Sequence, residues 1–154
     1  MIRRRCAPVW ARTTWPCGPR HRRRFAAHLR FVADEVLPWA ERDLGVLPHR
    51  WIAAGFSNGG AWAIAAAQRR PDLFPGVAAF SAGVVPRRVT AAARGVRHYL
   101  AAGSLEEGFR DATSGWAGRL AAAGLDVRYD EWTGGHDDLW WRELFPGALQ
   151  HLVR

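Results

Sequence analysis

A serine set between glycines is the part of this chain best suited to chemistry. Residues 55–59 read Gly-Phe-Ser-Asn-Gly, a G-x-S-x-G pattern centred on Ser57, and Gly60 follows. An apolar run precedes the pattern, and an alanine-rich run, residues 61–69, follows it. A strand, a sharp turn and a helix in that order hold a serine hydroxyl in the open, and glycines are needed because flanking side chains would clash with strand or helix. The pattern predicts that Ser57 is a nucleophile.

A serine nucleophile needs a base, and His136 is the best candidate. Imidazole removes a proton at neutral pH, and a carboxylate holds the imidazole in the required tautomer. Behind this kind of turn the partners follow in the order serine, acid, histidine, each in a loop at the carboxyl end of a strand. His136 lies in such a loop, within Gly134-Gly135-His136-Asp137-Asp138. The other five histidines precede the serine, lie beside or inside an expected strand, or lie near the last residue.

Several carboxylates compete for the role of the acid. Glu106, Glu107 and Asp111 all follow the third expected strand closely enough to reach the same loop. We assign Glu106, with Glu107 as the alternative. Asp137 is adjacent to His136, so we expect its side chain to point elsewhere.

Residues next to Ser57 and His136 could also contribute to an oxyanion hole, a metal site or a substrate pocket. The backbone N–H of Asn58, directly after the nucleophile, would form one half of an oxyanion hole. The run His136-Asp137-Asp138 could indicate a metal site, but no matching cluster of ligands accompanies it, so we expect neither a metal nor a cofactor. Trp140 or Trp141 would either pack against the body of the protein or form the wall of an acyl or aryl pocket.

Helices and strands alternate in the pattern that must position these residues. Apolar spacing of three and four predicts a first helix from Phe25 to Trp39, which Pro38 should kink or end. Alternation after it predicts an α/β fold, a mostly parallel sheet with helices on both faces. The expected strands are residues 50–54, 77–80, 96–102 and 127–132, the last nearer the sheet edge, and the expected later helices are residues 61–69, 109–123 and 139–153.

The charge of the chain is confined to its beginning. The net charge is +8, no lysine is present, and eight of the 22 arginines lie in residues 1–24 without an acid. Residues 25–154 are therefore neutral overall, and Cys6 and Cys17 also fall in the basic segment. We interpret residues 1–24 as a disordered or misassigned leader; the alternatives are an arm that binds phosphates or an anionic membrane, and a targeting segment. No apolar stretch approaches a membrane span, and we expect a cytoplasmic protein.

Together these motifs resemble the putative serine esterase family of α/β-hydrolases, above all its enterochelin esterase-like and esterase D-like members. The resemblance implies a serine esterase that cleaves a carboxylic ester through an acyl-enzyme on Ser57, with His136 as general base and the acid from the loop of Glu106. It implies a small-molecule ester as substrate. The stretches that carry it are Arg24–Trp39, Gly55–Ala61, Gly103–Glu106 and Gly134–Asp137, with Trp141 after the last.

One departure from the family pattern lies before the first helix. In the family several strands precede that helix, and a loop among them supplies the second oxyanion N–H. Residues 1–24 stand in that place here, so we expect residues 25–154 to be a partial, N-terminally truncated α/β-hydrolase domain. The first strand would then expose an apolar edge and favour self-association.

Two other functions remain open. The chain could be a catalytically impaired fragment or pseudoenzyme of the same fold, or a binder of nucleic acid or anionic surfaces through its arginine-rich segment, although we expect no nucleic-acid partner. The acyl and alcohol groups of the ester stay open, as does the choice between hydrolysis and acyl transfer.

Overall fold

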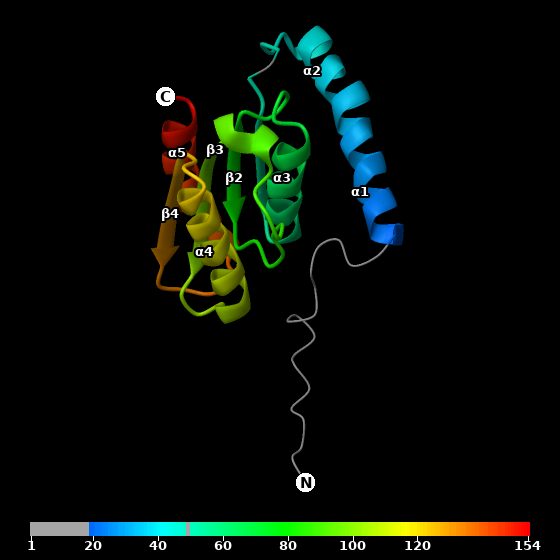
Figure 1. The fold of residues 1–154 in the computed structure, drawn as a ribbon. Helices are drawn as coiled ribbons and strands as arrows, with labels where there is room; N and C mark the ends of the chain where they lie inside the picture. Colours follow the sequence, from blue (N-terminus) through cyan, green and yellow to red (C-terminus); the bar gives the residue numbers. More distant parts are fainter. Residues whose placement is uncertain (1–18, 49) are drawn as a thin grey trace.

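Four strands form one sheet in which every neighbouring pair is parallel. Part of this sheet is labelled in Figure 1. The structure is a computed structural model, and it describes residues 19–48 and 50–154. The predicted α/β class is confirmed. The strands follow in space the order in which they follow along the chain: β1 (Ile52–Phe56), β2 (Gly76–Phe80), β3 (Arg97–Gly103) and β4 (Val127–Trp132).

Each strand has a sequence that suits its place in the sheet. β2 is buried along its whole length, as an apolar strand covered on both faces must be, whereas every residue of β4 except Trp132 is at least partly exposed. β4 forms one edge of the sheet, as expected. β1 forms the other edge among the described residues. It begins and ends two residues later than expected, so Gly55 and Phe56 belong to the strand.

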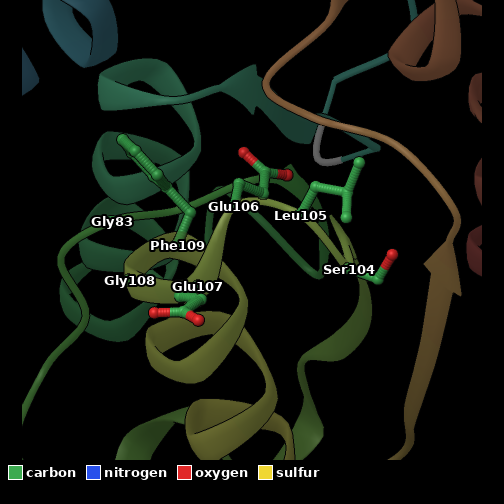
Figure 2. Close-up of a pocket in the computed structure, with 7 residues that line it drawn as sticks. All are labelled: Gly83, Ser104, Leu105, Glu106, Glu107, Gly108 and Phe109. Carbon is green, nitrogen blue, oxygen red and sulfur yellow. The ribbon is translucent and has the colours of Figure 1, made fainter.

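Because the strands are parallel, all four carboxyl ends lie along the same side of the sheet, toward the bottom of Figure 1. We call this side the carboxyl edge, and it is distinct from the edge strands β1 and β4. The first residue after three of these strands continues the pairing through its backbone. These hydrogen bonds run from Ser57 N–H to Phe80 O (2.9 Å), from Ser81 N–H to Ala101 O (2.8 Å) and from Ser104 N–H to Trp132 O (2.9 Å). The short connection from β3 to the next helix starts at Ser104 and is drawn in Figure 2.

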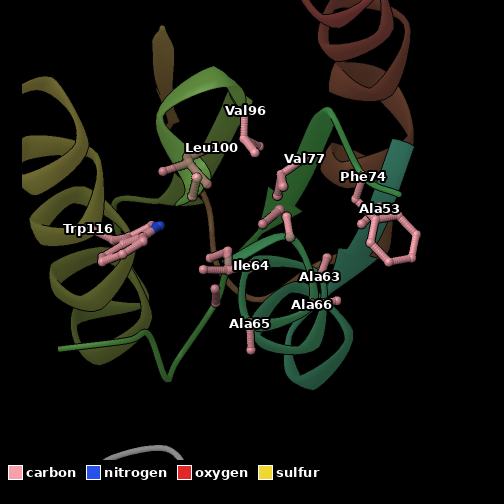
Figure 3. Close-up of a cluster of buried hydrophobic side chains, with 14 of the residues drawn as sticks. Ala53, Ala63, Ile64, Ala65, Ala66, Phe74, Val77, Val96, Leu100 and Trp116 are labelled. Atoms are coloured by element: carbon pink, nitrogen blue, oxygen red, sulfur yellow. The ribbon is translucent and has the colours of Figure 1, made fainter. Parts of the chain in front are cut away.

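Helices cover both faces of the sheet. α3 (Asn58–Arg69) and α4 (Glu107–Ala122) pack on one face, and α5 (Asp138–Leu152) packs on the other. Successive residues of β2 therefore enter different cores: Val77 and Ala79 pack toward α3, where small alanines allow close approach, while Ala78 and Phe80 pack toward α5. The α3 core, with Ile64 and Trp116 fully buried, is shown in Figure 3.

The first helix is longer than its apolar pattern predicts. α1 (Pro19–Phe31) begins before the expected start at Phe25, so residues 19–24, assigned above to the leader, are helical. Proline is favoured in the first turn of a helix, where its missing N–H costs nothing. A π-helical turn (Val32–Val36) leads directly into α2 (Leu37–Leu44), which contains Pro38 in its first turn. The chain therefore stays helical past Pro38: of the two expected outcomes, a kink or an end, the end is wrong.

Some expectations fall outside the part of the chain that the structure describes. Residues 1–18, with both cysteines and four of the eight arginines of the basic segment, are among them. Within the described residues, the one remaining element is a 3-10 turn (Ala91–Gly95) between β2 and β3. None of the helices in the described ranges is long and apolar enough to cross a membrane.

Candidate active site

The turn after β1 holds Ser57 in a strained backbone conformation. Its φ of 54° and ψ of −119° lie outside the regions favoured by residues with a side chain. Two of the three glycines are required by close approach: a Cβ at Gly55 would overlap the Gly59 carbonyl group, and one at Gly60 would lie 3.0 Å from the Phe80 carbonyl oxygen. A Cβ at Gly59 would meet no atom within 4 Å, so the expected clash does not apply at that position. The serine therefore stands at the junction between strand and helix that the G-x-S-x-G pattern predicts.

Glu106 is a buried carboxylate that accepts three hydrogen bonds. Its Oε1 accepts from Ser81 Oγ at 2.5 Å and from the backbone N–H of Gly103 at 2.6 Å. Its Oε2 lies 2.6 Å from Nδ1 of His136. The side chain is 4% exposed, so these partners, and not solvent, compensate its charge.

His136 is held by that carboxylate and by two aromatic rings. The centroid of its ring lies 4.3 Å from that of Phe109 and 4.9 Å from that of Trp141, to which it is nearly perpendicular. An ionised carboxylate only accepts hydrogen bonds, so the neutral imidazole carries its proton on Nδ1 and leaves Nε2 with a free lone pair. About a third of the side chain is exposed, which leaves this ring open to a substrate.

Ser57 and His136 lie at the same edge of the sheet. The ring of Trp141 lies between them: it stacks on Phe56, the residue before Ser57, at a centroid distance of 5.0 Å, and it also contacts the ring of His136. Within residues 19–48 and 50–154, however, no hydrogen bond joins Ser57 Oγ to the imidazole. In unliganded enzymes such bonds are often long and tighten only with substrate.

The other acidic candidates are not hydrogen-bonded to His136 among the described residues, and Asn58 lies at the start of a helix. Glu107, the alternative acid, is exposed at the start of α4, and Asp111 is exposed and paired with Arg110 at 3.1 Å. Asp137 caps α5 by accepting a hydrogen bond from the N–H of Leu139 at 2.8 Å, so its carboxylate is engaged by the helix. Asn58 is the first residue of α3, where backbone N–H groups lack helical partners and the helix dipole favours an anion.

The sequence reasoning missed Ser81. It is fully buried, follows β2 directly and has a positive φ of 51°. No motif surrounds it, and only its place after a strand, equivalent to that of Ser57, could have drawn attention to it. Phe109 was counted as part of an amphipathic helix, and its contact with His136 was also missed.

A pocket of about 500 Å³ opens beside the acid (Figure 2). Its lining is mostly apolar and includes Leu105, Phe109 and Gly83 together with Glu106. Ser57 and His136 do not line it, so it lies next to the histidine–carboxylate pair and is not centred on the serine. Among the described residues, no group of three or more His, Cys, Asp or Glu side chains is arranged to hold a metal ion.

Comparison with known proteins identifies the family. The family model described as "Putative esterase" matches residues 13–106, more than half of the chain. The chain belongs to this esterase family. The match spans the serine turn and ends at Glu106, so His136 lies beyond it. No protein of curated function matches the sequence of this esterase-family chain.

Solved structures with the same fold include esterases and a siderophore hydrolase. Enterochelin esterase from Shigella flexneri superposes with a TM-score of 0.73 at 23% identity, over 90% of this chain and 41% of that one. Ferric enterobactin esterase from Salmonella typhimurium gives 0.70 at 27% identity, over 88% and 40%. The siderophore hydrolase EstA from Aspergillus nidulans gives 0.65 at 22% identity, over 81% and 55%. This chain thus spans about half or less of the length of each of these structures.

Proposed function

We propose that this chain is a carboxylic-ester hydrolase in which Ser57 is the nucleophile, His136 the general base and Glu106 the residue that orients the base. The observation that carries the proposal is the Glu106–His136 hydrogen bond of 2.6 Å, at the same edge of the sheet as a strained serine turn. Membership in the esterase family supports ester hydrolysis as the general chemistry.

In the proposed reaction each of these groups has one role. Nε2 of His136 takes the proton from Ser57 Oγ as the oxygen bonds to the ester carbonyl carbon, and the backbone N–H of Asn58 stabilises the oxyanion. The imidazolium returns the proton to the leaving alcohol as the ester C–O bond breaks. Water then attacks the acyl-enzyme with the same base, which releases the carboxylic acid and restores Ser57. Glu106 stays ionised and stabilises the imidazolium.

The proposal is tested by labelling the purified protein with a fluorophosphonate, which reacts only with an activated serine. We expect one label, located on Ser57 by peptide mapping, and ester turnover that falls by about 10⁴-fold or more in Ser57→Ala. Ser114→Ala is the matched control, because this serine lies on α4 away from the sheet edge, and it should retain labelling and turnover. A folded wild-type protein that takes no label would reject the proposal and favour an inactive member of the fold.

A further inference from the structure

Ser81 connects three parts of the candidate site through one buried hydroxyl group. Its Oγ donates to Oε1 of Glu106 at 2.5 Å and accepts from Nε1–H of Trp141 at 3.0 Å. The residue follows β2, Glu106 follows β3, and Trp141 lies on α5. Both hydrogen-bonding directions of the hydroxyl are therefore used, one toward the acid and one from an aromatic ring that contacts His136.

The first of these bonds determines how the carboxylate is turned. With Oε1 held by Ser81 and by the backbone N–H of Gly103, Oε2 is the oxygen left to face Nδ1 of His136. Hydrogen bonds to a charged, desolvated group contribute more than those between neutral groups. Without the hydroxyl, Glu106 would keep only the bond from Gly103 on that oxygen and could rotate away from the imidazole.

The second bond fixes the ring beside the base. The indole of Trp141 has a single N–H donor, and Ser81 takes it. The ring so oriented stacks on Phe56 with an interplanar angle of 8° and meets the ring of His136 at 86°. The hydroxyl of Ser81 thus orients the Glu106 carboxylate directly, and it orients the Trp141 ring that packs against His136.

We propose that Ser81 is a positioning residue for the ester hydrolysis proposed above, on which this inference rests: it sets the rotation of the Glu106 carboxylate and the orientation of Trp141 around His136. Ser81 is not a second nucleophile, because its side chain is fully buried and its proton is donated to Glu106. Its φ is positive, a conformation that a serine adopts only at a cost, and strain of this kind is often found at functional sites.

Thr113 provides a matched control for a hydroxyl with only a structural role. It is also fully buried, and its Oγ1 donates to the carbonyl oxygen of Ala82, the residue next to Ser81, at 3.1 Å. Among the described residues it forms no side-chain hydrogen bond with Glu106 or Trp141. Thr113→Val and Ser81→Ala each remove one buried hydroxyl from the same neighbourhood, so both should lower stability, but only one should affect the chemistry.

The test is steady-state kinetics on an activated ester. Ser81→Ala should lower kcat by about 10- to 100-fold with KM changed by no more than about twofold, while Thr113→Val should leave kcat within about twofold of wild type. In a Glu106→Gln background, Ser81→Ala should cause a clearly smaller loss of kcat than in the wild-type background, because the part of its effect that acts through the acid is already absent and only the part that acts through Trp141 remains. A full, multiplicative loss in that background, or an unchanged kcat in the single variant, would overturn the proposal.

Two further measurements keep the test decisive. Ser81→Gly relieves the positive φ while removing the hydroxyl, so it should fold even where the alanine variant does not and should show the same fall in kcat. The low-field proton NMR signal of His136 Nδ1–H should move or broaden in Ser81→Gly and stay in place in Thr113→Val; the same position in both variants would count against the inference. If Ser57→Ala retains turnover, it is the proposed function that fails, and this NMR result still decides the role of Ser81.

Discussion

Two buried titratable side chains lie close to the opposite ends of strand β3: His98 at its amino end and Glu106 just beyond its carboxyl end. Their hydrogen-bond partners differ. At the amino end of β3 His98 is fully buried, and its Nδ1 lies 3.0 Å from the carbonyl oxygen of Val96, two residues back along the chain. Its Nε2 has no hydrogen-bond partner among the described residues. Beyond its carboxyl end Glu106 accepts hydrogen bonds from three separate segments of the chain.

The contrast follows from the topology of a parallel sheet. At the carboxyl edge, the loops after successive strands converge, so side chains far apart in sequence meet there and can act on one another. At the amino end of β3, the imidazole of His98 lies against the backbone carbonyl group of nearby Val96, and burial lowers its pKa to about 4. A group of that kind affects how stable the protein is at a given pH, whereas the group at the other end can take part in a reaction.

Of the substitutions that compare the two ends of β3, Glu106→Gln should have the largest effect, which is on kcat. The amide has nearly the same shape but no negative charge to stabilise an imidazolium, and its NH₂ can hold His136 in the wrong tautomer, so kcat should fall by about 10³- to 10⁴-fold. Glu107→Gln, at the exposed neighbouring acid, should change kcat by no more than about twofold. Ester turnover measured for both variants discriminates the two candidates, and a larger loss in Glu107→Gln would reverse the assignment.

The next effect concerns His98 and the pH dependence of stability. Burial lowers its pKa from 6.5 to about 4 in the folded protein. Between these values the unfolded chain binds a proton that the folded protein does not, so stability is full above pH 6.5, falls as the pH is lowered and loses nothing more from this group below about pH 4. The loss should reach on the order of 3 kcal/mol.

Urea unfolding midpoints between pH 4 and 7 check this expectation. His98→Phe should remove that part of the slope, whereas His28→Gln, which changes an exposed histidine of α1, should retain it. Identical slopes in wild type and His98→Phe would mean that this end of the strand is not the source of the pH dependence.

The smallest of the three effects compares glycines at opposite ends of the sheet. A Cβ at Gly103, at the carboxyl end of β3, would overlap the Gly134 carbonyl group in the loop that carries His136. A Cβ at Gly76, at the amino end of β2, would meet a side-chain atom of Ile52 at 3.2 Å, and that side chain can yield. Gly103→Ala should therefore cost about 2 kcal/mol of unfolding free energy, and Gly76→Ala less than about 1 kcal/mol.

Chemical denaturation of both glycine variants gives these values. Equal costs would show that the loop of His136 is free to move away from β3, which would weaken the view that the carboxyl edge is the more tightly constructed end.

Local patterns were sufficient to predict most of the fold. The order of strands and helices, the parallel sheet and the turn at Ser57 follow from short apolar runs and from glycines whose need is local. Errors concentrate at boundaries, as at Pro19 and Pro38, because a helix end depends on backbone adjustments that side-chain periodicity does not record. The self-association through β1 and the binding by the arginine-rich segment stay predictions.

Within the candidate site, sequence and tertiary structure determined different things. The sequence by itself determined that a serine turn, an acidic loop and a histidine loop follow three strands in order, since each is a property of a few consecutive residues. Only the tertiary structure decided that Glu106, and not Glu107, faces His136, because adjacent residues at a helix start point in different directions and their partners come from other strands. It alone revealed Ser81, a serine without a motif, whose neighbours become neighbours only when β2, β3 and α5 pack together.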